Sequence, residues 1–104
     1  MAYTVPMRYA SLASGSGGNC HAFAEGGRIL LLDAGISFKQ IRVRLEALGW
    51  DPGQVGAVAI SHEHSDHVAA LPMILKRTSW RILATEETLG AIQGIRELEL
   101  PEER

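Results

Sequence analysis

The segment 62–67 (HEHSDH) carries the densest chemistry in the chain, with three imidazoles and an aspartate carboxylate that follow an apolar, strand-like run. Neutral imidazole and carboxylate both bind zinc in proteins. In a loop that leaves a strand, residues two apart can point the same way, so we expect His62 and His64 to share one metal ion. Asp66 and His67, at the start of the next expected helix, would hold a second ion. Two ions about 3.5–4 Å apart could share a hydroxide and bind a phosphoryl or carbonyl oxygen.

Three other features receive structural interpretations. A lone histidine in a polar or half-buried position is usually not a ligand, and His21 in a short expected strand is assigned to packing or to the surface. Cys20 has no catalytic partner that the sequence identifies, so a small buried core residue is the better interpretation. The Gly-rich segment 14–18 could be a backbone nest for phosphate, but a tight turn is favoured because small, flexible residues mark turns. The segment lacks the lysine of a P-loop, so we do not expect nucleotide binding there.

The elements that must position the 62–67 segment are short strands alternating with helices. The helix at 37–48 is the clearest, because Phe38, Ile41 and Leu45 fall on one helical face and Ser37 starts a capping box. The alternation indicates an α/β fold. The expected strands are 7–12, 20–24, 28–33, 58–60 and 81–84, and the expected helices are 37–48, 68–77 and 85–92.

The strands predict an uncovered sheet face. The run 29–32 is apolar throughout, which suggests burial on both faces. Three helices of this size can cover only one face. A bare apolar face of that extent is rare in monomers, so a second copy of the chain or missing sequence should cover it.

Length and composition limit the alternatives. With 104 residues, 46% hydrophobic and 21% charged, the chain is expected to form one domain. The net charge of −2 makes no case for nucleic-acid binding, although a local basic patch remains compatible with it. The single cysteine indicates a reducing compartment, and the first ten residues do not resemble a secretory signal. No run approaches the ~20 apolar residues of a membrane span, and we expect a cytoplasmic location.

The segment 62–67 matches the H-x-H-x-D-H motif, and through it the chain resembles the metallo-β-lactamase-fold hydrolases. The segment 11–20 (SLASGSGGNC) is similar to the opening strand and turn of a bacterial subgroup, the WalJ-type proteins, and 31–35 (LLDAG) to their next strand. The resemblance covers most of the chain. It implies the amino-terminal half of an αββα sandwich, so that residues 1–104 would be a single partial domain: one mixed sheet with helices on one face.

Carried over by position, the resemblance makes His62 and His64 ligands of the first metal and Asp66 and His67 ligands of the second. The ions would be zinc, with manganese as an alternative. Asp66 would also orient or deprotonate the attacking water. Asp33 would steady the histidine loop, or else it is an ordinary turn-capping residue at the end of a strand; both interpretations stay open.

The chain departs from the family after position 67. In the family the second half supplies a third His for the first metal, an Asp that bridges both metals and a final His for the second, whereas the last His and the last Asp here are His67 and Asp66. The resemblance implies the front half of a metal-dependent phosphodiesterase or nuclease that uses a metal-bound hydroxide. Thioester or lactam hydrolysis is the alternative within the fold. A non-catalytic metal-binding half-domain is the alternative for this chain alone, which we expect to be inactive.

Overall fold

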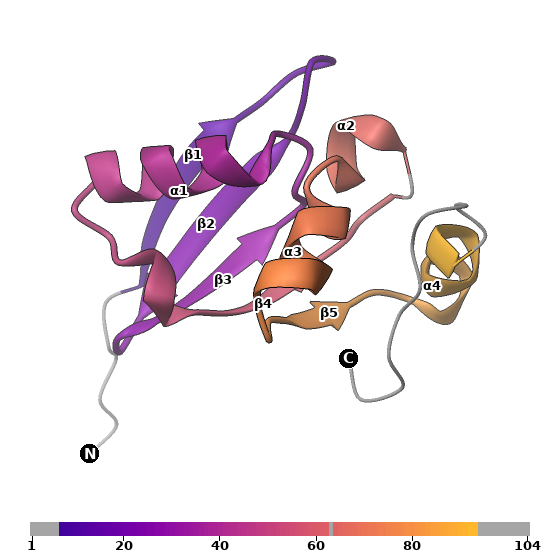
Figure 1. The fold of residues 1–104 in the computed structure, drawn as a ribbon. Coiled ribbons are helices and arrows are strands. Elements are labelled where there is room, and N and C mark those ends of the chain that lie inside the picture. The colour runs from indigo at the N-terminus through magenta and orange to yellow at the C-terminus, as the bar shows by residue number, and fades with distance from the viewer. Residues whose placement is uncertain (1–6, 63, 94–104) are drawn as a thin grey trace.

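A computed structural model describes residues 7–62 and 64–93, without the side chains of residues 65, 66 and 93. Its centre is one five-stranded sheet whose spatial order follows the chain (Figure 1). The first three strands pair antiparallel, while the third, fourth and fifth pair parallel, so the sheet is mixed as expected. The strands are β1 (Arg8–Ala13), β2 (Cys20–Glu25), β3 (Arg28–Leu32), β4 (Val55–Ala59) and β5 (Arg81–Leu83).

The longest helix has the capping signals that the sequence predicts. The Ser37 side chain accepts a hydrogen bond from the Gln40 backbone nitrogen at 3.2 Å, which satisfies one exposed donor of the first turn. Gly49, just after the helix, has a φ of +77°, a conformation that glycine adopts without strain. The helices are α1 (Phe38–Ala47), the 3₁₀ turn η1 (Pro52–Gln54), α2 (Ser65–Val68), α3 (Leu71–Arg77) and α4 (Glu86–Gln93).

Two expected elements differ from the structure by more than one residue at an end. The fourth strand begins at Val55, three residues before its expected start at Val58. The single helix expected at 68–77 is two helices, α2 and α3, separated by a turn at 69–70. Pro72 explains the break, because it has no N–H to continue a helix from α2 but fits the first turn of a new one.

Helices α1 and α3 cover one face of the sheet (Figure 1). Ile29 and Leu31 of β3 point into this buried layer, with Leu31 fully buried. The expectation that 29–32 is buried on both faces is therefore wrong for Leu30, which is 38% exposed. The strand alternates as a half-buried strand does, and only one side of it has helical cover.

The other sheet face is largely apolar and open. Tyr9, Leu30 and Leu83 on this face are 55%, 38% and 48% exposed. The bare face expected from the sequence is therefore present among the described residues. None of the helices described here is long and apolar enough to cross a membrane. Two rows of paired residues form the face: Tyr9, Phe23, Leu30, Ala57 and Arg81, and Ser11, His21, Leu32, Ala59 and Leu83.

Candidate metal centre

Strands β3 and β4 deliver the candidate residues to one edge of the sheet. Because the two strands are parallel, Asp33 after β3 and the histidine loop after β4 emerge side by side. The Asp33 nitrogen donates to Ala59 O at 2.7 Å, and the Ala34 nitrogen donates to His67 O at 2.7 Å. The backbone thus ties the end of β3 to both ends of the loop.

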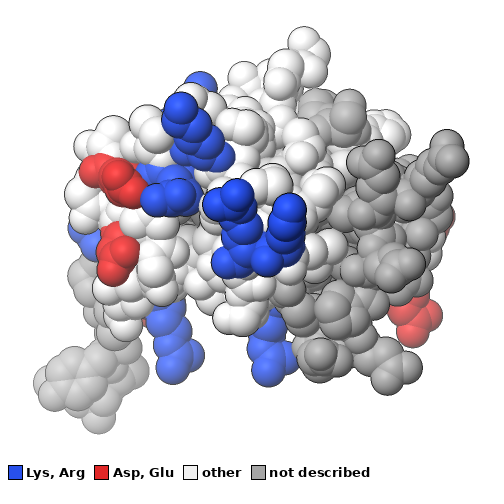
Figure 2. Space-filling model, viewed as in Figure 1, with Lys and Arg blue, Asp and Glu red and all other residues white. Residues whose placement is uncertain are grey.

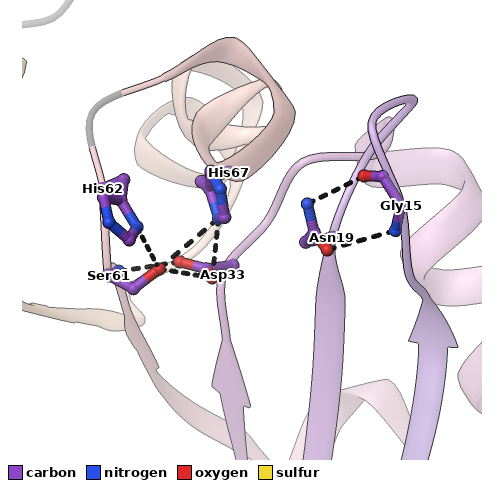
Figure 3. A network of polar contacts seen from close by, with 6 residues as sticks. All are labelled: Gly15, Asn19, Asp33, Ser61, His62 and His67. Carbon is purple, nitrogen blue, oxygen red and sulfur yellow. Dashed lines mark hydrogen bonds and ion pairs between the residues drawn. The ribbon is translucent and has the colours of Figure 1, made fainter.

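Asp33 is the centre of a polar network at this edge (Figure 3). Its side chain is almost fully buried, and one carboxylate oxygen accepts from the Ser61 backbone nitrogen at 2.7 Å. The other oxygen lies 2.7 Å from Ser61 Oγ and 2.8 Å from His67 Nδ1. Asp33 also has a φ of +65°, a left-handed conformation that aspartate tolerates better than most residues. This backbone turn brings the carboxylate under the histidine loop.

With an ionised Asp33 and neutral rings, the network favours one tautomer of His62 and of His67. An ionised carboxylate only accepts, so Ser61 Oγ and His67 Nδ1 both donate to Asp33. Ser61 has then used its one proton, and its oxygen can accept from His62 Nδ1, which lies 3.1 Å away. Neutral His62 and His67 therefore both have an unprotonated Nε2. That is the nitrogen through which either residue would bind a metal.

The three imidazoles lie near one another, but not at equal spacing. The ring centroids of His62 and His67 are 5.0 Å apart, while His64 lies 5.9 Å from His62 and 6.5 Å from His67. These spacings place all three rings around one small region at the end of β4, which is what shared or neighbouring metal ions would require.

The Asp66 backbone lies in α2, but its side chain is outside the described residues, as is all of Glu63. Among the side chains that are described, no three His, Cys, Asp or Glu residues form a complete metal-binding group. These donors nevertheless fit a metal ion. Hydrogen bonds through Nδ1, to Ser61 for His62 and to Asp33 for His67, leave Nε2 of both rings available as a ligand, and the His64 ring lies close by.

Cys20 and His21 have the surroundings of structural residues. Cys20 is fully buried, and burial, with a smaller effect of the nearby Asp33 charge, raises the pKa of its thiol to about 12. It therefore stays protonated at neutral pH and is neither a nucleophile nor a thiolate ligand. His21 lies on the open sheet face, where its Nδ1 is 2.7 Å from the Tyr9 hydroxyl.

The Gly-rich segment forms a tight turn beside the network (Figure 3). Asn19 accepts from the Gly15 nitrogen at 3.2 Å and donates to Gly15 O at 2.9 Å. The Gly18 nitrogen donates to Gly15 O at 3.2 Å. Two of the N–H groups that a phosphate nest would need are used within the turn, which favours the tight-turn interpretation.

Comparison with known proteins agrees with this geometry. The family model of the metallo-beta-lactamase superfamily matches residues 13–100, which is most of the chain. The chain belongs to the metallo-β-lactamase superfamily. A solved member, a B3 metallo-β-lactamase with an active-site glutamic acid, superposes with a TM-score of 0.72 at 16% identity, covering 82% of this chain and 32% of that one. The expected αββα architecture is thus confirmed at the level of a partial domain.

Several characterised proteins whose sequences are similar to this chain are nucleases. Exodeoxyribonuclease WalJ of Streptococcus pneumoniae is 33% identical over 90 residues, which are 86% of this chain and 34% of WalJ. Ribonuclease TTHA0252 of Thermus thermophilus is 40% identical over 60 residues, or 57% of this chain and 14% of the relative. The resemblance to WalJ-type proteins is confirmed, and the chain spans about a third of the length of WalJ.

Ser61 is the member of the network that the sequence did not reveal. It stands just before the histidine segment, outside the recognised motif, and its hydroxyl connects Asp33 with His62. A serine at the end of a strand has no distinctive sequence signal. Its role follows only from the pairing of β3 with β4, which brings it next to Asp33.

Proposed function

We propose that this chain supplies the first metal-binding half of a metal-dependent hydrolase that cleaves phosphodiester bonds in nucleic acid. The observation that carries the proposal is the network in which Asp33 and Ser61 prepare Nε2 of His67 and His62. Membership of the superfamily and the nuclease names of the relatives support the reaction class. Zinc is the proposed metal, with manganese as the alternative.

The residues have distinct roles in this proposal. His62 and His64 are the ligands of the first ion, and Asp66 and His67 are those of the second. Asp66 is also the proposed residue that orients or deprotonates the attacking water. Bound metal ions would supply an activated water and positive charge for the phosphate oxygens. Asp33 keeps the His67 ring in one orientation and one tautomer.

A specific observation favours a second proposal for the isolated chain, namely metal binding without turnover. No His or Asp follows position 67, so the ligands that the family takes from its second half have no counterpart here. We therefore expect the isolated chain to bind at most one weakly held ion and to hydrolyse nothing. Lactam or thioester hydrolysis stays the alternative chemistry for the whole protein, because it uses the same ligands.

Zinc titration by calorimetry tests the metal site directly. His62→Ala and His64→Ala are expected to abolish the binding that the unaltered chain shows. His21→Ala is the matched control, because it removes an imidazole from the open sheet face and should leave zinc affinity unchanged. Equal zinc affinity in all four proteins would contradict the metal centre.

Hydrolysis of bis-p-nitrophenyl phosphate tests the reaction class. The isolated chain should show no activity above the His64→Ala variant. A protein in which this chain is joined to, or paired with, a half that supplies the remaining ligands should be active and should lose this activity with the same substitution. Activity of the isolated chain that disappears in His64→Ala would overturn the non-catalytic proposal, and cleavage of a lactam in place of the phosphodiester would overturn the nuclease proposal.

A further inference from the structure

The helical layer concentrates positive charge in a chain whose net charge is negative. Helices α1 and α3 contain five of the ten Lys and Arg residues but only one of the twelve Asp and Glu residues, Glu46. Figure 2 shows Lys and Arg side chains gathered over this side of the molecule. The five basic residues are Lys39, Arg42, Arg44, Lys76 and Arg77.

A groove lies between the two helices. Its smaller part, about 430 Å³, is lined by Phe38, Arg42 and Arg77. The same three residues continue into a wider hollow of about 500 Å³ that reaches Trp80. The rings of Phe38 and Trp80 are 5.7 Å apart, and the Arg42 guanidinium lies 6.0 Å from the Phe38 ring centroid. We call Phe38, Arg42, Arg77 and Trp80 the helical groove.

Positive charge predominates in the smaller part of the helical groove, whose lining contains Arg42 and Arg77 and no carboxylate. Within residues 7–62 and 64–93, no carboxylate forms an ion pair with Arg42 or Arg77. Glu46 and Asp51 place negative charge in the wider hollow, so the smaller part is the proposed position for an anion. Two guanidinium groups facing one hollow can bind phosphate oxygens in bidentate fashion.

We propose that the helical groove binds the phosphate backbone of a nucleic-acid strand, at a site separate from the histidine loop. The wider hollow includes Val55, the first residue of β4, whereas the histidines follow the other end of that strand. Five strand residues span roughly 16 Å, so the two sites are distinct. The half-buried Phe38 offers an apolar contact for a base or sugar, which favours nucleic acid over an acidic peptide. This binding needs neither a metal nor hydrolysis, so it goes beyond the proposed function.

Fluorescence anisotropy with a labelled single-stranded DNA of about 15 nucleotides tests the proposal. EDTA in the buffer removes metal binding and cleavage from the measurement. Arg42→Gln/Arg77→Gln should weaken binding about 25-fold at 0.1 M salt. The negative slope of log K against log salt should become shallower by about 1.4, as expected for two lost phosphate contacts. Arg28→Gln is the control, because Arg28 is an exposed arginine at the β2–β3 hairpin.

Each outcome decides the proposal. Loss of affinity in the double variant and in Arg77→Gln alone, with Arg28→Gln unchanged, supports it; thermal unfolding checks that all variants are folded. Equal affinity of the double variant and the unaltered chain overturns it, as does an absence of DNA binding. Polyglutamate that competes as well as DNA would assign the groove to an acidic protein instead. A chain that binds DNA here but never binds zinc would refute the metal centre without touching this proposal.

Discussion

Replacing Asp33 by Asn should lower the metal affinity of the histidine loop strongly while lowering the free energy of unfolding only slightly. The amide oxygen can still accept from the Ser61 backbone nitrogen, now 2.7 Å from the carboxylate. The amide NH₂ would take the place of the oxygen that lies 2.8 Å from His67 Nδ1. Two donors cannot face each other, so His67 should move its proton to Nε2 and accept through Nδ1. The nitrogen proposed to bind metal would then carry a proton.

The contacts of Asp33 set the expected changes in the free energy of unfolding and in zinc affinity. Asn keeps the bond from the Ser61 nitrogen, replaces the charged bond to His67 by a weaker neutral one and tolerates the φ of +65°, so we expect a loss of about 1–2 kcal/mol in the free energy of unfolding. Ala loses all three bonds of a nearly buried carboxylate, and we expect about 3–5 kcal/mol, including the strain of a left-handed alanine. Zinc affinity should fall about 10–100-fold in Asp33→Asn, as for other carboxylates that orient a metal-binding histidine.

Three measurements check this reasoning. Urea denaturation gives the free energies of unfolding, calorimetry gives zinc affinity, and nitrogen NMR of the His67 ring reports its tautomer. Asp51→Asn is the matched control, because Asp51 also caps a turn, at Gly53, but belongs to η1. Zinc affinity in Asp33→Asn equal to that of the unaltered chain, or an unaltered His67 tautomer, would refute the account of the network.

Three further predictions concern the frame around the site. Gly18→Ala should destabilise the fold by about 2–3 kcal/mol, since its Cβ would lie 2.6 Å from Gly35 O, whereas Gly17→Ala meets nothing within 4 Å and should be nearly neutral in thermal unfolding. Because burial raises the pKa of the Cys20 thiol from 9.0 to about 12, the free energy of unfolding should fall by about 1.4 kcal/mol per pH unit between pH 9 and pH 12, relative to Cys20→Ala, and should be unaffected by this thiol below pH 9. The open sheet face should make the isolated chain self-associate in light scattering, and Leu30→Lys should reduce this; a monomer that binds no hydrophobic dye would argue against it.

The types of the helices and strands, and the clustering of three histidines in residues 62–67, were predictable because both depend on local sequence. Apolar spacing places α1, and the capping serine and the glycine after it predict its ends. Proximity in sequence also ensures that His62, His64 and His67 share a loop. The limits of α2 and α3 were not predicted, since the effect of Pro72 depends on whether the preceding segment is already helical. The alternation of β3 was likewise hidden by a run of four apolar residues.

The amino-acid sequence by itself determined which groups are available: three imidazoles in one loop, an aspartate after a strand and no later His or Asp. Only the tertiary structure decided how they act on one another, because Asp33 and Ser61 are 28 residues apart and meet through the parallel pairing of β3 and β4. The helical groove arises in the same way. Arg42 and Arg77 come from separate helices, and only their packing on one sheet face directs both charges into a single hollow.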